Sequence, residues 1–136
     1  MTGHTGAVVA RRRILLVCDL FRPVVGGTET HVESLARILA RRGHDVAVAT
    51  QHLPGTALVE DLDGIRVHRV RVWSRVLARA YEDRMYRHLP PLPDPGLAKG
   101  LRRVASTFRA DVVHVHGLAT FSAAAARLDA PVVATL

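Results

Sequence analysis

The sequence predicts an α/β fold with a doubly wound parallel sheet, because two kinds of pattern alternate along it. Short continuous apolar runs are typical of strands that are buried on both faces. Between them, apolar residues recur every three or four positions, as they do along one face of a helix. The chain has 136 residues, 49% of them hydrophobic, which suits one domain or one piece of a larger one. Helices on both faces of a parallel sheet account for this alternation.

Five strands and four helices follow from these patterns. We expect the strands at residues 14–18, 45–50, 65–72, 111–117 and 131–136. We expect the helices at residues 28–42, 73–89, 97–109 and 122–128. Residues 51–63, with Pro54 and Gly55, are expected to form a loop, and the proline-rich residues 90–96 a stiff connector. The alternation of the third strand slips at His68 and Arg69, which suggests a bulge or an edge position.

The expected domain organisation is simple. Residues 1–12 show no periodicity and are predicted to be a flexible N-terminal tail, and residues 13–136 to be one domain. The chain stops within the apolar run 131–136, so we expect an incomplete domain, truncated after its fifth strand.

Composition excludes several classes of protein. The net charge of +7 comes almost entirely from arginine, with Lys99 as the single lysine, and only 4% of residues are aromatic. No helix-turn-helix, zinc or aromatic-platform pattern accompanies that charge, so we expect no nucleic-acid partner. The single cysteine, Cys18, excludes a disulfide framework. The apolar run after Arg13 is too short for a signal peptide, and no membrane-spanning stretch occurs, so a cytoplasmic location is expected.

A glycine pair lies between the first strand and the first helix. Gly26 and Gly27 lack side chains, so a ligand can approach the backbone N–H groups there. The following helix directs its positive end at the same place, which favours a phosphate. An isolated glycine pair also fits a tight turn without any ligand, and the spacing is not that of the G-x-G-x-x-G dinucleotide motif.

Strand order decides which loops meet. Right-handed crossovers and the usual Rossmann-like order place the five strands as 3-2-1-4-5. Strands one and four are then neighbours, and ligands bind at such a switch point, at the carboxyl ends of the strands. The loop at residues 22–27 would therefore lie beside residues 116–120. Strand two ends without an acidic residue, which argues against a nicotinamide enzyme, and His114 with His116 lacks a third ligand, so no metal site is expected.

The predicted helix at residues 73–89 leaves two interpretations open. It has an apolar side containing Trp73 and arginines on or beside the other side, among them Arg75 and Arg79. Such a helix packs on a sheet, or it lies on an anionic lipid surface. Trp73, Arg75 and Arg79 are therefore candidate contacts to an acceptor or to a membrane.

Three segments resemble family 4 glycosyltransferases. Residues 23–31 read P-x-x-G-G-x-E-x-H, residues 39–46 read L-x-x-x-G-H-x-V, and residues 111–116 read D-h-h-H-x-H, where h is apolar. All three occur in the order and at the separations found in that family. The resemblance covers residues 13–136 except the variable part between 51 and 97.

The resemblance implies the N-terminal, acceptor-side domain of an enzyme with the GT-B fold, which has two Rossmann-like domains. Such enzymes transfer a sugar from an activated donor, usually a nucleotide sugar, to a sugar or lipid acceptor. They retain the anomeric configuration and typically hold no metal or other cofactor. The C-terminal domain, with its E-x7-E motif and most nucleotide contacts, is absent from this sequence. A non-catalytic binding module or an inactive fragment is the alternative.

Carried over residue by residue, the resemblance implies specific roles. Gly26, Gly27, Thr28 and Gly117 would contact the donor phosphates or substrate, and His116 would act catalytically beside the transferred sugar. We expect His116 to face the crevice, because it immediately precedes the loop. His114 lies one pleat deeper along the same strand and is expected to be structural.

Overall fold

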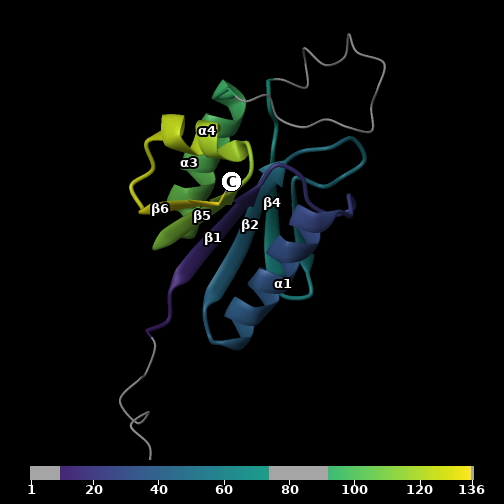
Figure 1. The fold of residues 1–136 in the computed structure, drawn as a ribbon, viewed down its shortest axis with the longest axis vertical. Coiled ribbons are helices and arrows are strands. Elements are labelled where there is room, and N and C mark those ends of the chain that lie inside the picture. Colours follow the sequence, from purple (N-terminus) through teal and green to yellow (C-terminus); the bar gives the residue numbers. More distant parts are fainter. Residues whose placement is uncertain (1–9, 74–91, 136) are drawn as a thin grey trace, which may run out of the picture.

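A computed structural model describes residues 10–73 and 92–135. The described chain forms one six-stranded sheet with helices on both of its faces (Figure 1). The strands are β1 (Arg13–Cys18), β2 (Asp45–Gln51), β3 (Val59–Leu62), β4 (Ile65–Val70), β5 (Val112–His116) and β6 (Val132–Thr135). The helices are α1 (Gly27–Arg41), α3 (Pro95–Phe108) and α4 (Ala119–Ala126). The predicted helix at 73–89 lies outside the described residues, apart from Trp73.

The strand order is β3-β4-β2-β1-β5-β6. The five predicted strands are β1, β2, β4, β5 and β6, and they lie in the predicted order with all neighbours parallel. The sixth strand, β3, corrects the prediction that residues 51–63 are only a loop. It pairs antiparallel with β4, with Leu62 opposite Ile65 across a tight turn at Asp63 and Gly64. β4 pairs with neighbours on both sides in unbroken register, so the expected bulge or edge position at His68 and Arg69 is absent.

The core is divided by the sheet into two layers. On one face, α3 and α4 pack over β1, β2, β4 and β5 through buried aliphatic residues such as Leu15, Leu97 and Leu101. On the other face, α1 packs over β1, β2 and β4 through Val32 and Ala36. Figure 1 shows α1 alone on its side of the sheet and α3 with α4 on the opposite side. All four residues of β6 are exposed.

Helix α3 begins two residues earlier than predicted, inside the expected proline-rich connector. Asp94 caps the helix by accepting a hydrogen bond from the Leu97 N–H at 3.0 Å, and Pro95 occupies the first turn. Proline suits that position because its missing N–H would have no partner within the helix. Gly100 lies so close to β4 that an added Cβ would overlap the side chain of Val70. A glycine therefore allows α3 to pack directly against the sheet.

Candidate functional site

The carboxyl ends of β1 and β5 lie at the same level of the sheet. Cys18, the last residue of β1, is paired in register with His116, the last residue of β5. The two strands therefore end side by side. β1 continues into the loop that leads to α1, and β5 continues into the loop that leads to α4 (Figure 1). The structure thus brings the glycine pair and His116 to one edge, as the strand order predicts.

The glycine pair forms the start of α1. Gly26 is the N-cap residue and supplies no side-chain hydrogen bond, although its carbonyl accepts the Thr30 N–H at 3.0 Å. A Cβ on Gly26 would lie 2.5 Å from a carboxylate oxygen of Glu29, whereas a Cβ on Gly27 would meet no atom within 4 Å. Neither residue needs the left-handed backbone conformation that favours glycine. The fold itself therefore does not require glycine at position 27, and the space beside it is open to a ligand.

The first N–H groups of α1, at Gly27 and Thr28, have no partner within the helix, as in any helix. An anion that approaches Gly27 would meet these donors and the positive end of a helix of 15 residues. The turn therefore presents backbone donors at the start of a helix, with the acidic Glu29 in the same first turn.

A second helix, α4, begins at this edge, and its first N–H groups are already hydrogen-bonded to a side chain of the protein. Gly117 has φ +82°, so glycine is favoured there by the turn itself. The carboxylate of Asp19, just after β1, accepts hydrogen bonds from the Leu118 N–H at 3.1 Å and the Ala119 N–H at 2.7 Å. A Cβ on Gly117 would lie 3.2 Å from both carboxylate oxygens. Sequence reasoning did not identify Asp19, although an acidic residue directly after a buried strand at a switch point was the available signal.

His116 lies in a cluster of three histidine rings on the α1 face of the sheet. Its ring centre is 4.1 Å from that of His114 and 5.6 Å from that of His31, which projects from α1. His114 is half-buried, and its Nε2 lies 2.9 Å from the Thr135 hydroxyl on β6. His116 is only 3% exposed, and its Nε2 finds no hydrogen-bond partner within residues 10–73 and 92–135.

The expected accessibility of the two histidines is therefore wrong. His116 is the more buried of the pair, although it lies nearer the end of the strand. The reason is tertiary, because the exposed His31 ring on α1 lies against His116. The position of His116 at the end of its strand does not show that a side chain from a helix covers it.

Burial controls the protonation of this cluster. Burial, together with neighbouring His114 and His31, lowers the pKa of His116 to about 4. Burial and His31 also lower the pKa of His114. Both rings are consequently neutral near pH 7, and each can donate one hydrogen bond and accept one. Burial raises the pKa of the neighbouring Cys18 thiol, which stays protonated and is unsuited to act as a nucleophile.

The candidate acceptor or membrane residues are only partly described. The Trp73 side chain is 62% exposed, and its backbone N–H donates to Asp94 at 2.9 Å. Arg75 and Arg79 lie outside the described residues. Within the described residues, no helix is long and apolar enough to cross a bilayer, and no group of three or more potential ligands is arranged to hold a metal ion.

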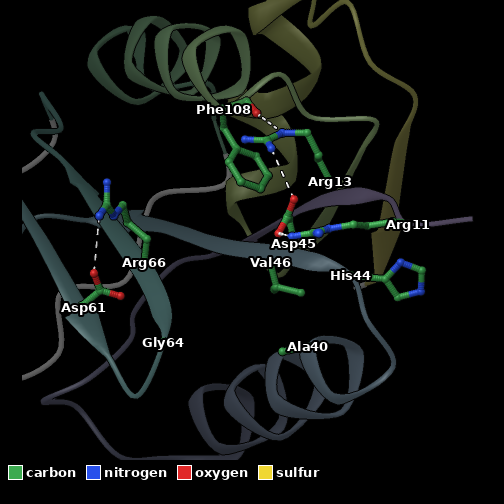
Figure 2. Close-up of a pocket in the computed structure, with 10 residues that line it drawn as sticks. All are labelled: Arg11, Arg13, Ala40, His44, Asp45, Val46, Asp61, Gly64, Arg66 and Phe108. Atoms are coloured by element: carbon green, nitrogen blue, oxygen red, sulfur yellow. Dashed lines mark hydrogen bonds and ion pairs between the residues drawn. The ribbon is translucent and has the colours of Figure 1, made fainter.

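A separate hollow of about 540 Å³ lies at the opposite edge of the sheet, beside the amino end of β2 (Figure 2). Its arginines are bound to acidic partners: Arg11 and Arg13 both contact Asp45, and Arg66 contacts Asp61 at 3.4 Å. The Arg13 guanidinium also stacks on the Phe108 ring, with its carbon 4.5 Å from the ring centre. These contacts join the start of β1 to β2 and α3, so the hollow is separate from the glycine loop and His116.

Fold and site together define a Rossmann-like domain in which a glycine pair starts a helix at the switch point of the sheet. Comparison with known proteins then gives the family. The model of Glycosyltransferase Family 4 matches residues 25–136, and the chain belongs to that family. Among curated proteins, no sequence matches it.

Several solved structures share the fold, including two synthases. Sucrose-phosphate synthase from Thermosynechococcus elongatus superposes with a TM-score of 0.64 at 16% identity, over 91% of this chain and 32% of its own. The catalytic domain of starch synthase IV from Arabidopsis thaliana, bound to ADP and acarbose, gives a TM-score of 0.58 at 16% identity, over 84% of this chain and 30% of its own. The chain therefore spans about a third of the length of these structures.

The histidine cluster predicts a fall in stability on acidification. In the unfolded chain His116 takes up its proton near its ordinary pKa of 6.5, but in the folded chain only near a pKa of about 4. The unfolded state therefore binds more protons between these values, and the free energy of unfolding should fall as the pH drops from about 6.5 to about 4. His116→Gln should weaken this fall, measured by chemical denaturation at a series of pH values. At pH 8 both proteins are uncharged at this position, so the comparison there isolates packing. An identical slope in the two proteins would contradict the proposed burial.

Proposed function

We propose that this chain is the N-terminal, acceptor-side half of a retaining glycosyltransferase with the GT-B fold. The enzyme would transfer a sugar from a nucleotide-sugar donor to a hydroxyl of a sugar or lipid acceptor. The observation that carries the proposal is the open start of α1. A Cβ added to Gly27 would meet no atom within 4 Å, and this residue lies at the same sheet edge as His116. Membership of Glycosyltransferase Family 4 supports it. A second domain of the same protein would supply the nucleotide contacts.

The start of α1 suits the leaving group of such a reaction. When the bond between sugar and phosphate breaks, negative charge grows on the departing phosphate oxygens. Backbone N–H groups that are already oriented toward that charge stabilise it without reorganisation. A phosphate beside Gly27 would be placed in this way by the N–H groups of Gly27 and Thr28. The fold relative whose structure holds ADP and acarbose is consistent with a nucleotide and a sugar as ligands. In this proposal the donor is a substrate, and no metal or other cofactor takes part.

His116 would contribute a neutral imidazole to the sugar. Its Nε2 lies unpaired in the described chain, and its pKa of about 4 keeps the ring uncharged at neutral pH. A buried polar atom without a partner is costly, and a ligand hydroxyl would satisfy it. The ring of His31 lies beside it, so a sugar that reaches Nε2 has to displace that exposed side chain.

Between a sugar and a lipid as acceptor, exposed apolar residues favour the lipid. Trp73 is 62% exposed and Leu92 is 64% exposed, on either side of residues 74–91. Tryptophan is a preferred residue at the boundary of a bilayer. Trp73, Arg75 and Arg79 would then contact an anionic membrane surface.

Gly27→Val should weaken donor binding by about tenfold or more, because a branched side chain would fill the space beside the first N–H groups of α1. The thermal midpoint should change little, since the substituted side chain meets open space. Titration of the full-length protein with its nucleotide-sugar donor measures the effect. Thr30→Val, which places the same side chain at an exposed position of α1, is the matched control and should bind the donor normally. Equal donor affinity of Gly27→Val and wild type would refute the phosphate site.

His116→Gln should lower turnover by about a hundredfold, the usual cost of losing a hydrogen bond made mainly in the transition state. Release of nucleoside diphosphate by the full-length protein is the measurement. His114→Gln changes a residue two positions away on the same face of the sheet and serves as the control. Its turnover should fall much less. A wild-type protein that binds nucleotide sugars but never turns them over would instead be the non-catalytic binding module.

The lipid-surface proposal predicts salt-sensitive binding to anionic vesicles by the full-length protein. Trp73→Ala should reduce the fraction that sediments with these vesicles. Phe121→Ala, which removes another exposed aromatic residue from α4, serves as the control. Negligible sedimentation with both anionic and neutral vesicles would end this part of the proposal.

A further inference from the structure

Arg69 is a buried charge that the sequence showed only as an irregularity in the third predicted strand. It occupies the next-to-last position of β4, and its side chain is 1% exposed. Arginine is almost never buried to this extent unless it is paired. The positions of its partners therefore indicate what the residue does.

The Arg69 guanidinium joins three separate segments. One terminal nitrogen, Nη1, donates to the Ala57 carbonyl at 3.0 Å, in the segment that leads into β3. The other, Nη2, donates to the Arg22 carbonyl at 2.8 Å and to Glu60 of β3 at 2.6 Å. Arg22 belongs to the loop between β1 and the glycine pair. The hairpin of β3 and β4 is thereby hydrogen-bonded to the loop that presents Gly26 and Gly27.

A second set of contacts holds the same loop residue from the other side. The Arg22 side chain binds the Glu33 carboxylate on α1 through Nε at 3.1 Å and Nη2 at 2.8 Å. Arg37 binds Glu33 at 2.9 Å and also Asp63, in the turn between β3 and β4, at 2.9 Å. Arg22 is thus fixed through its backbone by the hairpin and through its side chain by α1. The two attachments differ in strength, because the side chain of Arg22 is 53% exposed and exposed ion pairs contribute little.

We propose that Arg69 is a positioning residue, which holds the loop at residues 20–26 so that the start of α1 stays open at Gly27. The residue itself touches no part of the proposed ligand site. It acts through the Arg22 carbonyl, four residues before Gly26. A planar guanidinium with several donors is required, because one group has to bind two carbonyl oxygens and a carboxylate simultaneously. A lysine ammonium keeps the charge but lacks the fork geometry.

Amide hydrogen exchange in the full-length protein tests this inference independently of catalysis. The Val24 N–H donates to the Phe21 carbonyl at 3.0 Å in the loop, so its exchange reports loop opening directly. Arg69→Lys should raise exchange at Val24 by about tenfold, and Arg69→Met by more, while the amides of β1 keep their protection. Arg66→Met, on the same strand with a 60% exposed side chain, is the matched control and should leave Val24 unchanged.

The second measurement is kinetic and rests on the proposed function. Arg69→Lys should raise the KM for the nucleotide-sugar donor by about tenfold with little change in kcat, because a mobile loop weakens binding rather than the chemical step. Glu60→Gln, which leaves both carbonyl contacts in place, should have the smaller effect on KM. Wild-type exchange at Val24 in Arg69→Lys would overturn the inference, even if Arg69→Met fails to fold. An absence of turnover by the wild type with every nucleotide sugar would contradict the proposed function instead, while the exchange result would still stand.

Discussion

The parallel register between β1 and β5 is the constraint on which the candidate site depends. With Cys18 opposite His116, the two strands end at one level and their loops emerge side by side. A shift of one residue would move His116 to the other face of the sheet, away from α1. Both strands are almost completely buried at these positions, with Val17 and Val115 at 0% exposure. The hydrophobic layers on the two faces therefore fix the register, and the register in turn places the glycine loop beside the histidine cluster.

The two faces of the sheet are covered to different extents. α3 and α4 pack over one face, while on the other α1 packs over β1, β2 and β4. β5 and β6 carry His114, Val133 and Thr135 on that second face, and Val133 is 51% exposed. His116 is nevertheless buried, and the ring of His31 on α1 lies 5.6 Å from its own ring. The histidine cluster thus lies at the boundary between the part of this face that α1 covers and the part that carries the exposed Val133.

Most of the fold could be predicted because it follows from local patterns. Continuous apolar runs marked β1, β2 and β5, and the handedness of crossovers gave their order. β3 was missed because Val59–Leu62 contains two acidic residues and has no apolar run; it is a strand only through its pairing with β4. The glycine pair could be picked out from the sequence because a residue without a side chain leaves the backbone N–H groups accessible wherever it occurs. The Asp19 cap, the burial of His116 beneath His31 and the contacts of Arg69 all join residues far apart in the chain, and no local pattern encodes them.

The Asp19 carboxylate has an electrostatic consequence for the whole edge. Two helices, α1 and α4, begin there, and the positive end of each helix dipole lies at this edge. At α4 that end is neutralised by a side chain of the protein itself, through two short hydrogen bonds. At α1 the glycine N-cap supplies no side-chain hydrogen bond, but Glu29 lies in the first turn, and one of its carboxylate oxygens would be 2.5 Å from a Cβ on Gly26. Both helix starts at this edge therefore have an acidic side chain beside them, and only at α4 is the carboxylate hydrogen-bonded to the N–H groups of Leu118 and Ala119. An anion at the start of α1 would have to compete with Glu29, whereas at α4 the donors of Leu118 and Ala119 are already used.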